Sequence, residues 1–195
     1  MVSPLDSRRM ILRPICDGDN QQLCEWRNDV DYLKMVSNKR SLVSLEAFVS
    51  EQKRAFQTDR HLQFMIELKK DGLLVPIGTA YTFNFNLTDG HVFLNLYIEG
   101  EYRGCGYGPE AGVLTVCYLF DFFPLYKVCF ESFGYNDPSI SMMKTVGLGQ
   151  EGVFKGQRFF GGERFDIVRF AAYRDSLDRI RRLCERFQKK PKAIS

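Results

Sequence analysis

The segment "EYRGCGYGPEAG" (residues 101–112) has glycine at every second position three times, at Gly104, Gly106 and Gly108, and Pro109 follows. Glycine adopts backbone conformations that other residues avoid, and it lets a ligand approach the main chain closely. The N–H groups of such a loop, and of the helix that begins behind it, attract anions, and diphosphate is their usual ligand. We therefore interpret these residues as a diphosphate-binding loop. The alternative is a turn that only joins a strand to a helix.

Two familiar phosphate loops do not fit this spacing. The Rossmann pattern needs a third glycine where Pro109 stands, and the P-loop needs a Gly-Lys-Ser/Thr sequence that the segment lacks. The order of residues 103–108 instead matches the signature R/Q-x-x-G-x-G/A, with Arg103 in first place. Through this signature the chain resembles the GNAT acetyltransferase superfamily, in which the loop holds the pyrophosphate of acetyl-coenzyme A.

The resemblance extends over about residues 8–173. The sequence "YIEGEYRGCGYGPEA" resembles the end of the family's fourth strand and its loop, and "YLFDFFPLYKVCFESFGYNDPSI" resembles the next helix, the fifth strand and an Asn-x-x-Ser motif. "VGLGQEGVF" resembles the K-x-G-F-x-x-E-G turn, with Leu148 in place of Phe, and "FDIVRFAAY" the terminal strand. "LRPICDGDNQQLCEWRND" is similar to the branch that includes ribosomal-protein-alanine acetyltransferases.

The resemblance implies a set of cofactor contacts. Backbone groups at the end of the fourth strand contact the pantetheine and the thioester oxygen, at Leu96, Tyr97 and Ile98. Backbone amides of the loop bind the diphosphate, at Arg103, Gly104, Cys105, Gly106, Tyr107 and Gly108. Asn136 and Ser139 contact the pantetheine or order its loop, with capping of a helix as the alternative. The Arg103 side chain reaches phosphate or pairs with Glu101.

Acetyl transfer to an amine requires that the amine lose a proton and that the carbonyl be polarised. Glu131 is the candidate general base, because the resembling alanine acetyltransferases carry a glutamate at this position, and strand alternation places it opposite Phe130 and Ser132. Its alternative is a solvent-facing strand residue, and His91 is a second candidate base.

The general acid departs from the family pattern. Met143 occupies the place of a common tyrosine and cannot donate a proton. Tyr135 or Ser141 then supplies the proton, or water does, or the thiolate leaves unassisted. The catalytic set is therefore Glu131, Tyr135 and Tyr97, the last at the thioester.

The expected fold is a single-domain GNAT-like α/β structure, with a mixed, mostly antiparallel sheet of about seven strands flanked by helices. Residues 1–173 form the acetyltransferase domain, and residues 174–195 form a basic amphipathic helix and tail. Strands are expected at residues 9–15, 61–68, 73–85, 91–98, 126–133, 150–159 and 164–173. Helices are expected at residues 21–29, where Asp17 or Asp19 provides the cap, and at 44–56, 109–123, 136–147 and 174–190.

The composition excludes several classes of protein. The net charge of +3 comes from residues 174–192, which hold a net +5, so nucleic acid is not an expected partner of the body. The six cysteines form no C-x-x-C pair and the two histidines are far apart, so neither a disulfide frame nor a metal site is expected. No signal peptide or membrane span is recognised, and a cytoplasmic location is expected.

The predicted activity is acetyl-CoA-dependent N-acetylation of a primary amine on a small molecule such as an amino sugar. The sequences "EWRND" (25–29) and "YLKMVSN" (32–38) resemble acceptor-side helices of sugar-amine acetyltransferases, where Trp26 stacks on a sugar or belongs to the core. The alternatives are protein N-terminal acetylation, polyamine acetylation, and a cofactor-binding module without catalysis. Polyamine acetylation is disfavoured because the acceptor-side helices carry no acidic cluster. The terminal helix is expected to dock through Leu177, Ile180, Cys184 and Phe187, either on the body of its own chain or on a second copy. A homodimer is therefore one of the two possibilities.

Overall fold

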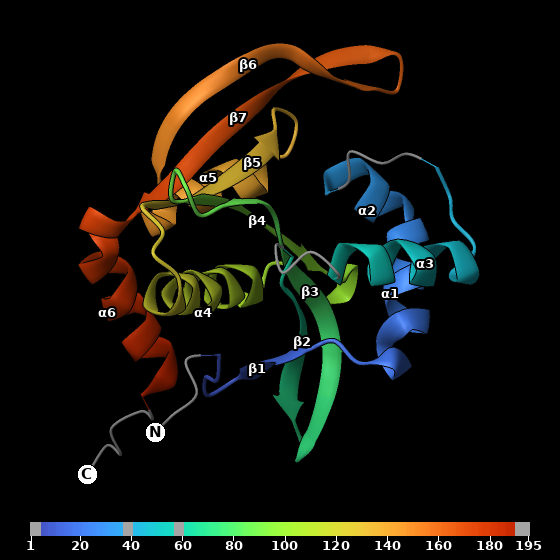
Figure 1. Ribbon diagram of the computed structural model, residues 1–195, viewed down its shortest axis with the longest axis horizontal. Coiled ribbons are helices and arrows are strands. Elements are labelled where there is room, and N and C mark those ends of the chain that lie inside the picture. The colour runs from blue at the N-terminus through green and yellow to red at the C-terminus, as the bar shows by residue number, and fades with distance from the viewer. Residues whose placement is uncertain (1–4, 37–40, 57–60, 190–195) are drawn as a thin grey trace.

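A seven-stranded sheet runs through the whole molecule in the order β1-β2-β3-β4-β5-β7-β6 (Figure 1). The computed structural model describes residues 5–36, 41–56 and 61–189. Neighbouring strands are antiparallel, except that β4 and β5 are parallel. The strands are β1 (Met10–Pro14), β2 (Gln63–Lys70), β3 (Leu73–Asn86), β4 (His91–Ile98), β5 (Lys127–Phe133), β6 (Gly149–Phe160) and β7 (Glu163–Tyr173).

Helices cover both faces of this sheet. Figure 1 shows α4 and α6 on one side and the group α1, α2 and α3 on the other. In chain order the α-helices are α1 (Asn20–Asn28), α2 (Val30–Met35), α3 (Leu45–Phe56), α4 (Tyr107–Phe122), α5 (Asp137–Val146) and α6 (Leu177–Gln188). Short 3-10 turns precede three of them, η1 (Asp17–Asp19), η2 (Gly100–Tyr102) and η3 (Arg174–Ser176). The expected fold class and its seven strands are confirmed.

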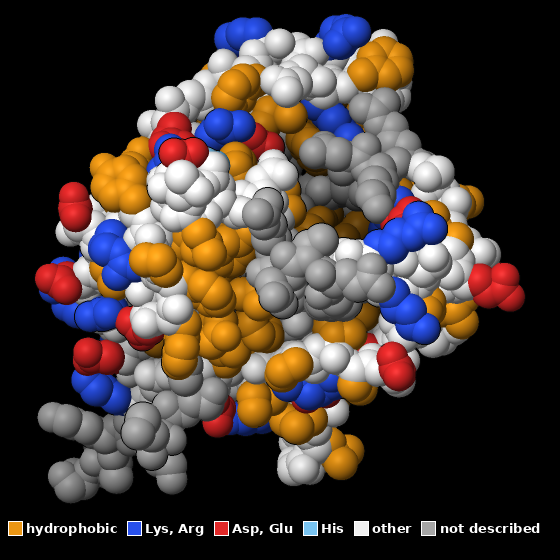
Figure 2. Space-filling model, in the orientation of Figure 1, with side chains coloured by type: hydrophobic (Ala, Val, Ile, Leu, Met, Phe, Trp, Pro, Cys, Tyr) orange, Lys and Arg blue, Asp and Glu red, His pale blue; other side chains and the backbone are white. Residues whose placement is uncertain are grey.

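Two hydrophobic cores lie on the two faces. In β2, Ile66 packs into the larger core with α4, while its neighbour Met65 packs into the smaller core with α1 and α3. A strand covered by helices on both faces buries nearly every residue. This explains why the middle of β2 is continuously buried although its sequence alternates. On the face seen in Figure 2, apolar side chains gather over α4.

Strands β4 and β5 separate after a short paired stretch. Residues 91–93 pair with residues 127–129, and no later pair joins the two strands within the described chain. Beyond this point β4 stays paired with β3 as far as Ile98, and β5 with β7 as far as Phe133. The sheet therefore opens between the carboxyl ends of its two central strands.

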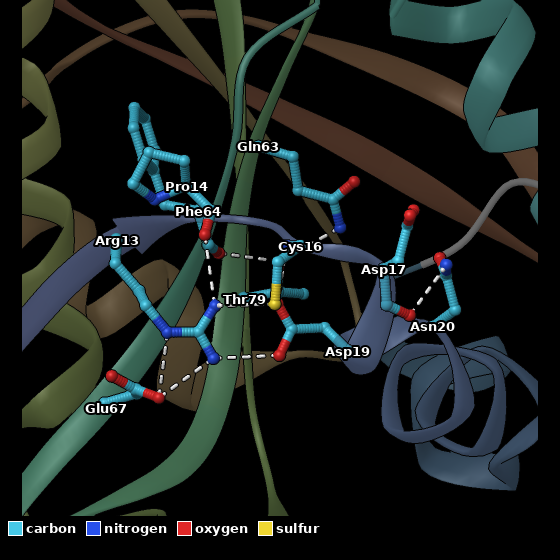
Figure 3. Close-up of polar contacts among 10 residues, drawn as sticks. All are labelled: Arg13, Pro14, Cys16, Asp17, Asp19, Asn20, Gln63, Phe64, Glu67 and Thr79. Atoms are coloured by element: carbon cyan, nitrogen blue, oxygen red, sulfur yellow. Dashed lines mark hydrogen bonds and ion pairs between the residues drawn. The ribbon is translucent and has the colours of Figure 1, made fainter.

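A network of ion pairs joins β1, β2 and the start of α1 (Figure 3). Arg13 donates to both oxygens of Asp19, at 2.7 and 2.8 Å, and its Nε donates to Glu67 at 3.0 Å. The hydrogen bonds from Arg13 lower the pKa of Asp19 to about 2. Asp19 occupies the N-cap position of α1 but makes no side-chain cap bond there, so the expected cap is wrong. Its carboxylate accepts from Arg13 and from the Cys16 amide instead.

Helix α6 packs against its own body. The expected stripe is the buried one, because Leu177, Ile180 and Cys184 belong to the larger core. The carbonyl of Phe187 accepts a hydrogen bond from the Arg8 amide at 3.1 Å. The last expected helical residue, 190, lies outside the described residues, as do residues 37 and 38 of the acceptor-side segment. In the described chain no helix has the length and apolarity to cross a membrane.

Candidate functional site

The glycine loop leads directly into α4, which begins at Tyr107 rather than near residue 109. Gly106 is its N-cap, and Gly104 and Gly106 have φ values of +78° and +79°. These values strain any residue with a side chain, so both positions need glycine for conformation. Gly108 has no such φ, and a Cβ there would only touch Ile98 at 3.8 Å. The protein itself therefore does not require glycine at position 108.

Arg9 and Glu110 support the loop from behind. Arg9 donates from Nη1 to the Cys105 carbonyl at 3.0 Å and from Nη2 to the Gly106 carbonyl at 3.4 Å. Its Nε donates to the buried carboxylate of Glu110 at 2.7 Å, and Ser7 donates to the same carboxylate at 2.6 Å. The loop carbonyls are thus held on one side. The first N–H groups of α4 have no intrahelical acceptor and stay available on the loop.

Arg103 has a different protein partner from Glu101, the one that the sequence suggested. It forms an ion pair with Asp31 of α2 at 2.8 Å, not with Glu101, and its Nε donates to the Ile98 carbonyl at 2.7 Å. Its guanidinium also lies 5.6 Å from the ring centroid of Tyr97. Arg103 therefore connects the loop to α2.

A narrow apolar slot of about 20 Å³ lies beside the loop, where β4 and β5 have separated. It is lined by residues of β4, α4, β5, α5 and α6, among them Leu96, Gly108, Phe130, Met142 and Ile180. Two of the predicted cofactor residues, Leu96 and Gly108, thus line one cavity. Asn136 and Ser139 do not line it. The Asn136 side chain accepts from the Ser139 amide at 3.3 Å and caps α5, which is the alternative given for them.

Leu96 lines this slot, and its backbone amide is a candidate donor there. Amides of β4 alternate in direction, and the Glu99 amide bonds to Ile77 of β3, so the Leu96 amide points toward the opening beside β5. In the structure it donates to the Asn95 side chain at 2.8 Å. Asn95 in turn donates to the hydroxyl of Tyr81 at 3.0 Å.

A larger pocket of about 290 Å³ lies on the other face of the sheet, beneath α1, α2 and α3. Successive strand residues point to opposite faces, so Asn95 lines this acceptor-side pocket while Leu96 lines the slot. One strand end therefore separates the two cavities. The pocket is lined by Arg27, Tyr32, Val36, Phe48, Glu51, Gln52, Ala55, His61, Gln63, Tyr81, Phe83 and Asn95.

Burial shifts the pKa of several pocket groups in the direction that favours their neutral forms. It raises the pKa of Tyr32 and of Tyr81 above the ordinary phenol value, and it lowers the pKa of His61 below the ordinary imidazole value. Sequence reasoning counted His61 only when judging metal sites and did not single out Arg27 or Asn95. Their common signal is spatial, because the pocket takes Arg27 from α1, Asn95 from β4 and His61 from the segment before β2.

Glu131 lies on β5, on the side opposite Phe130, as alternation predicts; Phe130 faces the slot. Its Oε1 accepts two hydrogen bonds from Arg169, from Nε at 3.0 Å and from Nη2 at 2.6 Å. The carboxylate is about one-fifth exposed and does not line the acceptor-side pocket.

The two candidate tyrosines are both engaged in structure. Tyr135 donates its hydroxyl proton to the Lys34 carbonyl of α2 at 2.6 Å. Tyr97 is 3% exposed and packs between Trp26 and Tyr32, and burial raises its pKa to about 12. Trp26 is thus a core residue and not a stacking platform. Met143, in the place of the family tyrosine, is buried in the larger core.

A match to a family model defines the class of this protein, which is an acyltransferase. A family model described as "Acetyltransferase (GNAT) domain" matches residues 9–149, so the chain belongs to the GNAT acetyltransferase family. A search of curated proteins finds no match. In the described residues, no group of three or more His, Cys, Asp or Glu side chains is placed to hold a metal ion.

Solved structures show the same fold at low sequence identity. A spermidine N-acetyltransferase from Vibrio cholerae in complex with coenzyme A and spermine superposes with a TM-score of 0.79 at 17% identity, covering 86% of this chain and 97% of that one. The ribosomal L7/L12 α-N-protein acetyltransferase RimL in complex with coenzyme A gives a TM-score of 0.76 at 12% identity, covering 90% and 99%. An acetyltransferase from T. thermophilus gives a TM-score of 0.74 at 16% sequence identity, covering 93% of this chain and 95% of that one.

Proposed function

We propose that this protein transfers the acetyl group of acetyl-coenzyme A to a primary amine of a small molecule, of which an amino sugar is one example. The observation that carries the proposal is the position of the β4 end, with the glycine loop and apolar slot on one face and a pocket of about 290 Å³ on the other. The coenzyme A in two of the structural neighbours supports the choice of co-substrate.

The residues around the loop fit a coenzyme A molecule. The expected donors run from Arg103 to Gly108, but the Arg103 amide already donates to the Gly100 carbonyl at 3.2 Å. The diphosphate would therefore lie on the amides of residues 104–108, because Arg9 holds the loop carbonyls on the other side. The pantetheine arm would enter the slot between β4 and β5, where Gly108 leaves room that the protein does not itself fill. In our proposal Asn136 and Ser139 act indirectly, because their hydrogen bond fixes the start of α5 beside the path of the pantetheine arm.

The thioester supplies an activated acetyl group, and the chain supplies the donor and the base. The Leu96 amide would polarise the carbonyl, once Asn95 turns its oxygen away. Glu131 is the proposed base, acting directly or through a water. Both bonds from Arg169 go to Oε1, so Oε2 keeps lone pairs for a proton. His61, an imidazole that lines the pocket, is a further candidate that the sequence did not suggest, whereas His91, the second candidate from the sequence, begins β4 and does not line the pocket.

Single-turnover acetylation of an amine panel tests this function. The preloaded enzyme is mixed with neutral amino sugars, charged amino sugars, amino acids, a polyamine and a peptide N-terminus, and acetylated product is followed by mass spectrometry. Acetylation of a small amine at a rate above the uncatalysed reaction supports the proposal. A protein that binds coenzyme A but acetylates only the peptide, or nothing, contradicts it.

A further inference from the structure

Arg27 is a buried cation in the wall of the acceptor-side pocket. It lies in the last turn of α1 and is 6% exposed. Neither Nη1 nor Nη2, both shielded from solvent, has a hydrogen-bond partner in the described part of the chain. A guanidinium stays protonated and carries five donors, and burying it without a partner is costly. Such an arrangement is stable only where something else compensates the charge.

The groups near Arg27 do not provide that compensation. Tyr32 and Tyr81 carry the nearest hydroxyls in the pocket, and burial keeps both phenols protonated. Asp29 is two residues away in sequence, but its carboxylate caps α2 by accepting from two backbone amides, at 2.9 and 3.1 Å. No ion pair joins Arg27 to an acidic side chain among the residues that the structure describes. Glu51 also lines the pocket, but its side chain is exposed and accepts no hydrogen bond from Nη1 or Nη2 of Arg27.

We infer that the acceptor carries an oxyanion, a carboxylate or a phosphate, besides its amine, and that Arg27 binds this group. The inference rests on the proposed function and names its substrate class. The planar fork of a guanidinium matches both oxyanions with paired hydrogen bonds. The Tyr81 hydroxyl accepts from Asn95 and keeps its own proton, so it adds a donor to the same site. The amine lies toward Asn95 and the β4 end.

This site disfavours polyamines. An uncompensated guanidinium in the pocket wall repels a second cation, and the repulsion is strong where water is excluded. The spermidine acetyltransferase among the structural neighbours shares the fold at 17% identity, and identity this low carries the fold without the substrate.

Matched pairs of acceptors test the inference. Glucosamine 6-phosphate is compared with glucosamine, and β-alanine with β-alaninamide, so that each pair differs mainly in the oxyanion and the two pairs separate phosphate from carboxylate. Spermidine is the polycation. The wild-type protein is expected to favour the anionic member of at least one pair by about ten- to a hundredfold in kcat/KM. Arg27→Met is expected to remove that preference, so that the anionic member of the pair loses about ten- to a hundredfold more in kcat/KM than the neutral member does.

Two measurements separate binding from folding. The ligand-free Arg27→Met variant should melt no lower than the wild type, because an unpaired buried charge has been removed. Arg54→Met is the matched control, since Arg54 is exposed on α3 and does not line the pocket. It should keep the wild-type preference. If Arg27→Met does not fold, the inference of an unpaired charge is contradicted, and Arg27→Gln repeats the rate comparison.

Each remaining outcome decides one claim. Equal rates within both pairs, a preference for spermidine, or an equal loss on all acceptors in Arg27→Met would overturn the inference while leaving acetyl transfer intact. If no amine is acetylated, titration calorimetry measures whether glucosamine 6-phosphate or β-alanine binds to the wild type and to Arg27→Met. Binding that depends on Arg27 would keep the oxyanion site and refute the proposed function, and no binding would refute both.

Discussion

The glycine loop and the acceptor-side pocket flank the same strand end but are built from different kinds of groups. The loop is one continuous segment, and its predicted donors are backbone amides arranged by Gly104 and Gly106. The pocket gathers side chains from several elements, including Arg27, His61 and Asn95. A site made of backbone groups can be predicted from a short sequence motif. A site made of side chains from separate elements forms only when the chain folds, so no motif predicts it.

Glu131→Gln should separate chemistry from cofactor binding more strongly than any other single change. A positioned base contributes about 10²–10⁴-fold, so kcat/KM should fall by that range near neutral pH. Coenzyme A affinity should not change, because Glu131 lies on the side opposite Phe130 of the slot. The loss should shrink at high pH, where the free amine is abundant. Stopped-flow rates across the pH range measure this.

Glu163→Gln is the matched control for that variant, since Glu163 is exposed at the start of β7. It should behave as the wild type. Native rates for Glu131→Gln at every pH would remove Glu131 from the mechanism and leave His61, which lines the pocket with a lowered pKa, as the base to test.

Gly78→Ala should damage both regions together, because they share the end of β4. A Cβ at position 78 would lie 2.0 Å from the Tyr97 carbonyl oxygen, and backbone cannot move aside cheaply. We expect the free energy of unfolding to fall by about 1–3 kcal/mol, with weaker binding of coenzyme A. Gly100→Ala, where a Cβ meets nothing within 4 Å, is the control. Chemical denaturation that gives equal stability for both variants would contradict this close approach.

Asp19→Asn should affect the pocket side alone, because Arg13 and Asp19 fix the start of α1 to β1 and β2. The pKa of Asp19 is lowered from 3.8 to about 2 in the folded protein. Its stabilisation is therefore complete above pH 3.8 and is lost as the pH falls through 2. The wild type should lose about 2 kcal/mol from this group over that window.

Denaturation at a series of pH values from 6 to 2 measures this difference. The free energy of unfolding of Asp19→Asn should not show the acid-dependent loss that Asp19 causes in the wild type. Asp17→Asn changes an exposed neighbour and should still show that loss. Parallel acid sensitivity of Asp19→Asn and the wild type would mean that the ion pair with Arg13 does not stabilise the fold.

The sequence predicted most of what depends on local rules. The order of the strands and of five of the α-helices follows from periodicity, but the six-residue helix α2 is not among the expected helices. Gly147 ends α5 with a φ of +88°, as expected of a helix-terminating glycine. Predictions failed where a distant residue competes for a side chain. Asp19 does not cap α1 because Arg13 takes its carboxylate, and Arg103 pairs with Asp31, 72 positions away. The partner of Glu131, Arg169, lies on a neighbouring strand 38 positions later, and sequence alone does not give that register.

The central claim is that the loop amides at residues 104–108 bind the diphosphate of coenzyme A. Titration calorimetry with coenzyme A on Gly106→Asp tests it most directly, with Gly100→Asp as the control that places the same carboxylate in nearby open space. Gly106→Asp strains a φ of +79° and sets a negative charge at the loop. The account predicts that its Kd rises by roughly a hundredfold or more, while Gly100→Asp keeps the wild-type Kd. A folded Gly106→Asp protein with unchanged affinity would contradict the account.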